Sequence, residues 1–164
     1  MATSNKNLSV YRPEDIPNAK QMRFAIVVSD WNSEITNELC RGCTDTLIRS
    51  GALKNNIDVT HVPGSFELTL AAQWLAESEE YDAIICLGCV IQGETRHFDF
   101  ICQSVTQGIT QLNMVYNIPV VFGVLTTNTF EQAKDRAGGK HGNKGDEAAI
   151  TAIKMSALKK EIRG

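Results

Sequence analysis

The sequence predicts a three-layer α/β/α sandwich built on a four-stranded parallel sheet. Apolar runs that resemble buried strands alternate with segments of helical spacing along the chain, and this alternation gives a parallel sheet with right-handed crossovers. The predicted strands are apolar throughout and do not alternate in polarity, which indicates that helices cover both faces of the sheet.

The chain divides into a short arm and one domain. Residues 1–21 are polar and contain Pro13 and Pro17, so they are predicted to form an extended arm and not a helix. Residues 22–164 show no internal repeat and have a length that suits a single domain. A domain of this size buries enough core to need no disulfide or metal ion.

Four apolar runs are the predicted strands. Residues 24–28 and 120–125 are continuous apolar runs. Residues 57–62 end at Pro63-Gly64, which breaks a strand, and residues 83–91 lead into a glycine-containing turn. Short apolar runs bounded in this way are typical of strands buried on both faces.

Five segments have the features of helices. In the first, apolar residues recur at every fourth position from Ile35 to Leu47, and Gly51 is placed as its C-cap. The last carries Ile150, Ile153 and Ala157 on one face. The predicted helices are residues 33–50, 66–79, 98–115, 129–137 and 146–162, with a loop over residues 138–145.

Composition excludes several classes of partner. The 164 residues are 43% hydrophobic and 21% charged, with a formal net charge of −3, so nucleic acid is not an expected partner. No apolar run is long enough to span a bilayer, and the polar N-terminus lacks the apolar region of a signal peptide. The expected location is the cytoplasm, without a membrane partner.

The cysteines include two pairs with the spacing of zinc ligands, Cys40-x-x-Cys43 and Cys86-x-x-Cys89. The first pair lies within a predicted helix. The second lies along a strand, where residues three apart point to opposite faces. We therefore expect no metal site and interpret the cysteines as free thiols of a reducing compartment.

A glycine-bracketed turn after the third strand is the strongest functional signal. It opens a helix, and N–H groups at a helix N-terminus bind anions. Gly88 to Thr95 has the spacing of a nucleotide P-loop, but Glu94 stands where that motif needs lysine. We therefore expect a phosphate other than that of a nucleotide, with His97 close enough to transfer protons.

Further candidates follow the first two strands or, like Phe122, lie in the fourth, and in a parallel sheet the ends of these strands share one edge. Trp31, Glu67 and Phe122 would offer rings and a carboxylate to a flat, hydroxylated ligand. Each also has a structural reading: Trp31 as a cover for the strand edge, Ser65 and Glu67 as the start of a helix, and Phe122 as core. The loop 138–145 and nearby Arg136 suggest anion binding, or only a flexible connection.

Four segments resemble the 6,7-dimethyl-8-ribityllumazine synthase family, over about residues 22–160: residues 62–67, 88–99, 122–126 and 131–145. The resemblance implies a flavodoxin-like fold and an enzyme of riboflavin biosynthesis. Members condense 5-amino-6-(D-ribitylamino)uracil with 3,4-dihydroxy-2-butanone 4-phosphate, release phosphate and water, and use no cofactor or metal.

The resemblance also implies a role for each site residue. His97 is the implied catalytic proton relay, with Glu147 as a supporting carboxylate. The implied phosphate ligands are Gly93, Glu94, Thr95 and Arg136. The residues implied to bind the ribitylamino-uracil are Trp31, Ser65, Phe66, Glu67, Val90, Ile91, Phe122 and Lys144. Of these sets, Phe122, Lys144 and Arg136 are implied to come from the neighbouring subunit.

Three positions depart from the common family pattern. Gln92 stands where arginine is frequent, and Cys89 stands where alanine or valine is common. Trp31 replaces the phenylalanine of many members, and its larger ring should stack better on flavin-like molecules. We therefore hypothesise that the protein binds riboflavin.

The resemblance implies a homopentamer with shared active sites. The short form of the loop 138–143 favours a shell of 60 subunits, whereas the proline-containing arm leaves the choice between pentamer and shell open. A riboflavin synthase partner is a further option. A flavin-binding or shell-forming paralogue without catalysis, and a flavodoxin-like electron carrier, remain as alternatives, although His97 and Arg136 favour the enzyme.

Overall fold

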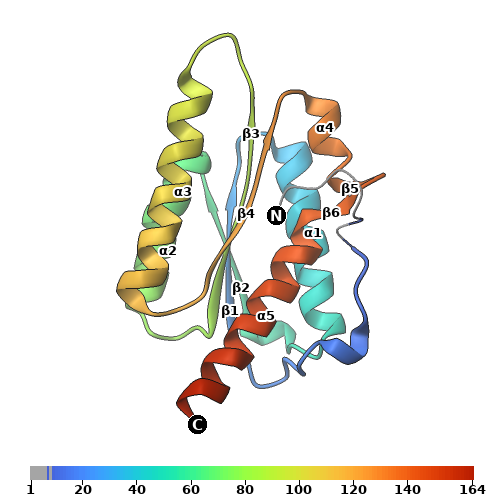
Figure 1. The fold of residues 1–164 in the computed structure, drawn as a ribbon, viewed down its shortest axis with the longest axis vertical. Helices are drawn as coiled ribbons and strands as arrows, with labels where there is room; N and C mark the ends of the chain where they lie inside the picture. Colours follow the sequence, from blue (N-terminus) through green and yellow to red (C-terminus); the bar gives the residue numbers. More distant parts are fainter. Residues whose placement is uncertain (1–6, 8) are drawn as a thin grey trace.

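The computed structural model describes residues 7 and 9–164 and confirms the predicted fold class. One sheet of four parallel strands lies between two helical layers (Figure 1). Its strand order is β2-β1-β3-β4. The strands are β1 (Phe24–Ser29), β2 (Ile57–Val62), β3 (Ala83–Ile91) and β4 (Val120–Thr127).

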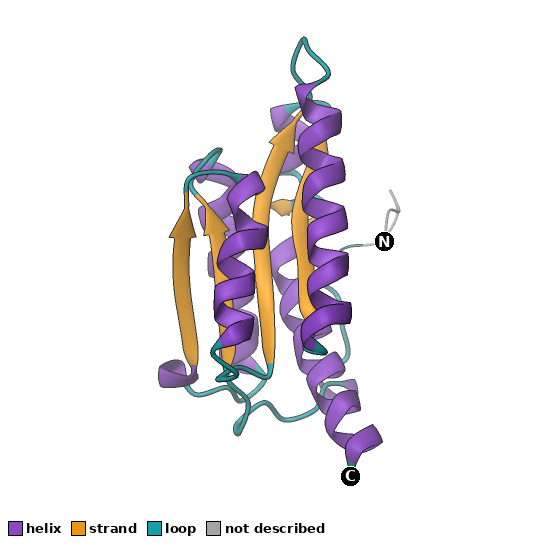
Figure 2. Cartoon of the chain, turned by 90° about the vertical axis from the view of Figure 1, so that its left-hand side faces the viewer, coloured by secondary structure: helices purple, strands orange, loops and turns teal. Residues whose placement is uncertain are grey.

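Helices cover both faces of the two central strands (Figures 1 and 2). α1 (Ser33–Arg49) and α5 (Lys144–Arg163) pack on one face, and α2 (Leu68–Glu77) and α3 (His97–Tyr116) pack on the other. The short α4 (Phe130–Lys134) follows β4. The structure also contains three 3₁₀ turns: η1 (Pro13–Asp15), η2 (Lys54–Asn56) and η3 (Ser65–Glu67).

The central strands β1 and β3 are apolar because both of their faces are buried. In β1, Phe24 and Ile26 face the core beneath α1 and α5, whereas Ala25 and Val27 face the core beneath α2 and α3. All four side chains are buried. Burial of both faces accounts for the continuous apolar run. In a sheet with one face exposed to solvent, apolar and polar residues would alternate along the strand.

The predicted end of α1 is correct to within one residue: the helix ends at Arg49 and its C-cap is Ser50, so Gly51 is the residue after the cap. Gly51 has a φ of 98°, which glycine adopts at little cost. Its N–H donates to the carbonyl of Ile48, and the N–H of Ala52 donates to the carbonyl of Leu47. This pair of hydrogen bonds is the Schellman motif, which satisfies carbonyl groups in the last turn of the helix.

The expectation that every strand is covered on both faces is wrong for β2. Residues 58–61 of this strand are all exposed. β2 pairs only with β1 and forms the edge of the sheet, beyond the helices that contact β1 and β3. Its sequence, Ile-Asp-Val-Thr-His-Val, contains three polar residues, so the prediction that every strand is apolar throughout is also wrong for β2.

The segment 138–145 is not a loop. It contains two short antiparallel strands, β5 (Ala137–Gly139) and β6 (Gly142–Asn143), and α5 begins directly afterwards at Lys144. Gly138 and Gly142 have positive φ angles of 105° and 80°, so glycine permits the tight reversal.

The described part of the arm is not wholly extended, because it includes η1. It also contacts its own chain. The Oγ of Ser9 accepts a hydrogen bond from the N–H of Asn143 at 2.9 Å, and Arg49 donates to the hydroxyl of Tyr11 at 3.4 Å.

We expect Gly145→Ala to destabilise the fold by about 3 kcal/mol, because a methyl group there would overlap the backbone carbonyl oxygen of Leu39 in α1. Urea unfolding of the variant measures this loss. Gly93→Ala is the control: a methyl group at position 93 meets no atom within 4 Å, and its effect should stay within about 0.5 kcal/mol. Equal stabilities of the two variants would contradict the account of the α1–α5 contact.

Candidate functional site

A cavity of about 700 Å³ lies where the strands β1, β2 and β3 end, on the edge toward which the arrowheads point in Figure 2. We call it the first pocket. Its volume suits a ligand of the size of a nucleoside. It is lined by Trp31, residues 63–67, residues 89–91, Gly93, Thr95, His97, Phe98 and Ile101.

Trp31 stands on a short loop that is fixed by its neighbours. Its N–H donates to the carbonyl of Pro63 at 3.1 Å. The next residue, Asn32, has a left-handed backbone with a φ of 62°, and its amide donates to the carbonyl of Cys89 at 2.9 Å. Trp31 is 72% exposed. Hydrogen bonds therefore fix the backbone of this loop, while the indole ring stays accessible to a ligand in the pocket.

The turn η3 supplies the wall beside Trp31. Ser65 is buried, whereas Phe66 and Glu67 are exposed. The side chain of Ser65 caps neither η3 nor α2, which removes the structural reading of this residue as an N-cap. Its Oγ instead points toward Gly88, where a Cβ would approach it to 2.7 Å. Because Glu67 is exposed and lines the first pocket, its carboxylate is available to hydroxyl groups of a ligand.

The turn between β3 and α3 is the third wall, and it extends furthest at the top of Figure 1. Residues 92–97 are all exposed. His97 is the first residue of α3, and its N–H lies 3.4 Å from the Oγ1 of Thr95. Gly88 lies within β3, paired with Val124, so it cannot form part of a phosphate loop. The resemblance to a P-loop is therefore coincidental.

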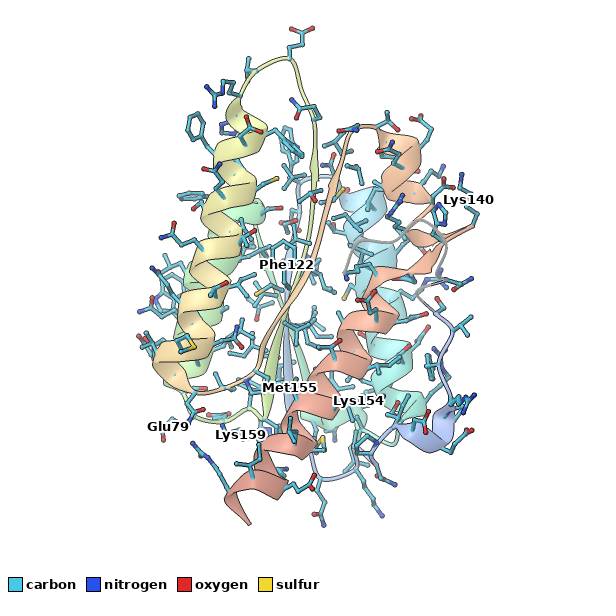
Figure 3. All side chains as sticks on the ribbon, viewed as in Figure 1. Glu79, Phe122, Lys140, Lys154, Met155 and Lys159 are labelled. Carbon is cyan, nitrogen blue, oxygen red and sulfur yellow. The ribbon has the colours of Figure 1, made fainter. Side chains whose placement is uncertain are left out.

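A second pocket, of about 450 Å³, opens at the free edge of β4. Phe122 and Met155 lie there between α3 and α5 (Figure 3). Lys144 and Glu147 also line it, and the Nζ of Lys144 lies 2.9 Å from the Oε1 of Glu147. The side chain of Lys144 is only 15% exposed, so this ion pair is partly shielded from water.

The structure therefore divides the predicted site residues between two places. Those in the first pocket are Trp31, Ser65, Phe66, Glu67, Val90, Ile91, Gly93, Thr95 and His97. Those in the second pocket are Phe122, Lys144 and Glu147. Glu94 and Arg136 line neither. Glu147 thus does not share a pocket with His97 within one chain.

Arg136 stands between α4 and β5, on the side of the molecule that carries α1 and α5 (Figure 1). Its Nη1 donates to the carbonyl of Gln132 at 3.0 Å. This bond holds the guanidinium against the carbonyl of Gln132 in α4 and leaves further N–H donors for a ligand.

Several residues that shape the first pocket were not among the predicted site residues. Asn32 holds the Trp31 loop, and Phe98 and Ile101 line the pocket from α3. The spacing of Phe98 and Ile101, three residues apart next to His97, is the signal that places them on one helical face.

The thiols near the site are not ionised near neutral pH. Burial raises the pKa of Cys86 to about 12, and burial likewise raises the pKa of Cys89, which lines the first pocket, to about 12. A neutral thiol is a weak nucleophile, so the pocket gains no cysteine nucleophile. Across residues 7 and 9–164, no three His, Cys, Asp or Glu side chains gather in a metal-binding arrangement.

The buried thiols should make the protein sensitive to alkali. The folded pKa of Cys86 lies above the value of 9.0 for a free thiol, so its contribution to stability is complete below about pH 9 and is lost as the pH rises toward 12. Urea unfolding at about pH 8 and about pH 10.5 should show a smaller loss for Cys86→Ala than for the wild type. An equal loss in both proteins would contradict this assignment.

No helix in the described part of the chain combines the length and the apolar character needed to cross a membrane.

Comparison with known proteins gives a consistent match. The sequence profile described as 6,7-dimethyl-8-ribityllumazine synthase matches residues 21–160. A protein of that name from Cytophaga hutchinsonii is 62% identical over 157 residues, which cover 96% of this chain and 98% of the relative. Proteins of the same name from Porphyromonas gingivalis and Christiangramia forsetii are 57% and 56% identical, over 98% and 99% of this chain and 99% and 98% of the relatives.

Proposed function

The chain belongs to the 6,7-dimethyl-8-ribityllumazine synthase family, and we propose that it makes this lumazine in riboflavin biosynthesis. The substrates are 5-amino-6-(D-ribitylamino)uracil and 3,4-dihydroxy-2-butanone 4-phosphate, and the reaction releases phosphate and water. The observation that carries the proposal is the first pocket, which places an exposed indole, a carboxylate, a helix N-terminus and a histidine around one cavity.

Each wall of the first pocket suits one part of the substrates. The ring of Trp31 offers a face on which the pyrimidine stacks. The carboxylate of Glu67 accepts hydrogen bonds from the ribityl hydroxyls. The turn over Gly93, Glu94 and Thr95 precedes α3, whose N-terminal N–H groups favour a phosphate. Glu94 would contribute through its backbone N–H, because its carboxylate would repel the anion.

The chemistry asks for few strong catalytic groups. The aryl amine attacks the ketone and a Schiff base forms with loss of water. Phosphate then leaves, and the second amine closes the ring on the remaining carbonyl with loss of a second water. Orienting the two substrates supplies much of the acceleration, since effective molarities can be very large. His97 relays the protons of these steps as a general acid and base. The proposed reaction uses no cofactor or metal.

We propose that a second copy of the chain completes the site. The residues that should close it, Phe122, Lys144 and Arg136, lie outside the first pocket of their own chain. A surface that meets a different surface of the next copy makes a heterologous contact, and such contacts generate rings when the rotation closes. Exposed apolar side chains in the segments that line the first pocket suit burial in this contact: Phe66 and Phe100.

The proposed ring is the homopentamer of the family, and the short hairpin of β5 and β6 favours its further assembly into a 60-subunit shell. A riboflavin synthase partner inside such a shell belongs to the same proposal. The free cysteines fit the reducing cytoplasm that we propose as its location.

The direct test is turnover by the purified protein. Mixing it with the ribitylamino-uracil and the butanone phosphate should yield the fluorescent lumazine together with one equivalent of phosphate. Folded, oligomeric protein that yields neither product would contradict the proposed activity and favour a binding or shell-forming paralogue.

We expect the assembled protein to bind riboflavin through Trp31. The indole is exposed and sits on a fixed loop, so an isoalloxazine ring can replace the pyrimidine on its face. Titration into riboflavin should quench flavin fluorescence, and Trp31→Ala should weaken the affinity by roughly tenfold. Trp74→Phe, which changes the exposed tryptophan of α2, is the control and should bind as the wild type does. Flavin fluorescence that does not change on titration would refute the hypothesis.

A further inference from the structure

Asn143 lies at the junction of α1, the β5–β6 hairpin and α5, and it is 7% exposed. Figure 1 shows these elements side by side at the start of α5. The Oδ1 of Asn143 accepts a hydrogen bond from the N–H of Gly145 at 2.7 Å and so caps α5. Its Nδ2 donates to the carbonyl of Glu38 in α1 at 2.8 Å. Both ends of one buried amide are therefore satisfied, each by a different helix.

The packing around this amide is close. A Cβ at Gly42 of α1 would approach the Nδ2 of Asn143 to 2.5 Å, so only glycine at position 42 lets the amide reach the carbonyl of Glu38. The amide thus has a fixed place along α1, and its cap fixes the first turn of α5 relative to that place. The hairpin strand that carries Asn143 is held by the same two bonds.

This anchor is adjacent to two residues of the proposed active site. Asn143 pairs with Ala137 across the hairpin. Next to this pair, the N–H of Lys144 donates to the carbonyl of Arg136 at 2.8 Å. The backbones of Arg136 and Lys144 are therefore tied together, and Asn143 ties both to α1.

We infer that Asn143 is a positioning residue for the phosphate-bearing substrate. It acts through Arg136, whose guanidinium must meet the phosphate held by the first pocket of the neighbouring copy, and this inference rests on the proposed function. A displacement of the hairpin along α1 moves Arg136 away from that phosphate. Small displacements of an orienting group lower catalysis strongly.

Asn143→Ser removes one of the two hydrogen bonds of the side chain and keeps the other. Serine is an effective N-cap and retains the bond to Gly145, but its side chain is too short to reach the carbonyl of Glu38. Asn143→Asp is the second variant, because it keeps the shape and the cap while it replaces the Nδ2 donor with an oxygen that cannot donate when ionised.

The control is Thr46→Val. Thr46 is buried at the same contact between α1 and α5, where its Oγ1 donates to the Oδ1 of Asp146 at 3.1 Å. This bond does not involve the hairpin. A loss of helix packing alone should therefore affect Thr46→Val and Asn143→Ser alike, whereas a loss of positioning should affect only the asparagine variants.

The experiment measures KM and kcat for the butanone phosphate in the assembled wild type, Asn143→Ser, Asn143→Asp and Thr46→Val, and then in Asn143→Ser combined with Arg136→Ala. Asn143→Ser should raise KM roughly tenfold and change kcat less, and Thr46→Val should leave KM within about twofold. In the Arg136→Ala background, Asn143→Ser should change KM by less than about twofold, because the residue it positions is gone.

An unchanged KM in both asparagine variants of an active enzyme would overturn the inference and leave the proposed function intact. The inference would also be overturned if Asn143→Ser raised KM equally in the wild type and in the Arg136→Ala background. Absence of turnover by the wild-type assembly would instead overturn the proposed function, and the inference with it.

Discussion

His97→Ala is expected to lower kcat by about 10²–10⁴-fold without abolishing turnover. His97 is the histidine of the first pocket and lies at the exposed start of α3, beside the turn that should hold the phosphate. General acid–base catalysis by one side chain contributes a factor of this size. The remaining rate should come from substrate orientation, which the substitution leaves in place.

The size of the loss distinguishes proton transfer from contact. His97→Gln keeps much of the volume and hydrogen-bonding capacity of histidine but does not titrate near neutral pH. We therefore expect it to be nearly as slow as His97→Ala in steady-state assays of the assembled enzyme. Full activity of the glutamine variant would contradict the proton relay, and complete loss of activity in a folded alanine variant would contradict the share assigned to orientation.

Arg136→Ala is expected to lower kcat/KM for the butanone phosphate by about 10–100-fold, mainly through KM. A hydrogen bond between charged partners contributes about 1.5–3 kcal/mol, and a guanidinium can contact two phosphate oxygens at once. Arg136→Lys should recover only part of the loss, because an ammonium ion cannot make this paired contact.

Steady-state kinetics with each substrate varied in turn measure this effect. KM for the ribitylamino-uracil should change little in Arg136→Ala, since the arginine is assigned to the phosphate. Arg41→Ala is the control, because Arg41 is an exposed arginine of α1 that lines neither pocket. Unchanged kinetics in Arg136→Ala would remove Arg136 from the site.

Much of the fold could be predicted because burial leaves a direct mark on sequence. The bounds of β2 and β3 are those predicted, since Pro63-Gly64 ends one and a long apolar run defines the other. The exposure of β2 was missed although Asp58, Thr60 and His61 are polar, because the strand was interpreted as apolar throughout. Its place at the edge of the sheet is a property of topology. The β5–β6 hairpin was missed because its strands consist largely of glycine, which gives no strand signal.

The site could be predicted in part for the same kind of reason. Residues that follow the ends of parallel strands must meet at one edge, and this rule alone brings Trp31, Glu67 and His97 together. The same rule was wrong for Phe122, which was expected at this edge but lies within β4 and lines the second pocket. It gives no place for Lys144, which lines the same second pocket. Asn32 was missed because its role depends on a left-handed backbone and one hydrogen bond to β3, which no local pattern announces.

The separation of the two pockets leads to the central claim, that catalysis requires residues of two copies of the chain. His97→Ala and Arg136→Ala subunits, each purified, unfolded and then refolded together, test it directly. If the two residues act across an interface, about one interface in four of a randomly mixed ring combines an intact His97 with an intact Arg136. Measured at a butanone phosphate concentration well below KM, the mixture should then regain about a quarter of the wild-type rate, above either variant alone. Turnover that stays at the level of the separate variants, in mixed rings verified by mass spectrometry, would contradict the shared site.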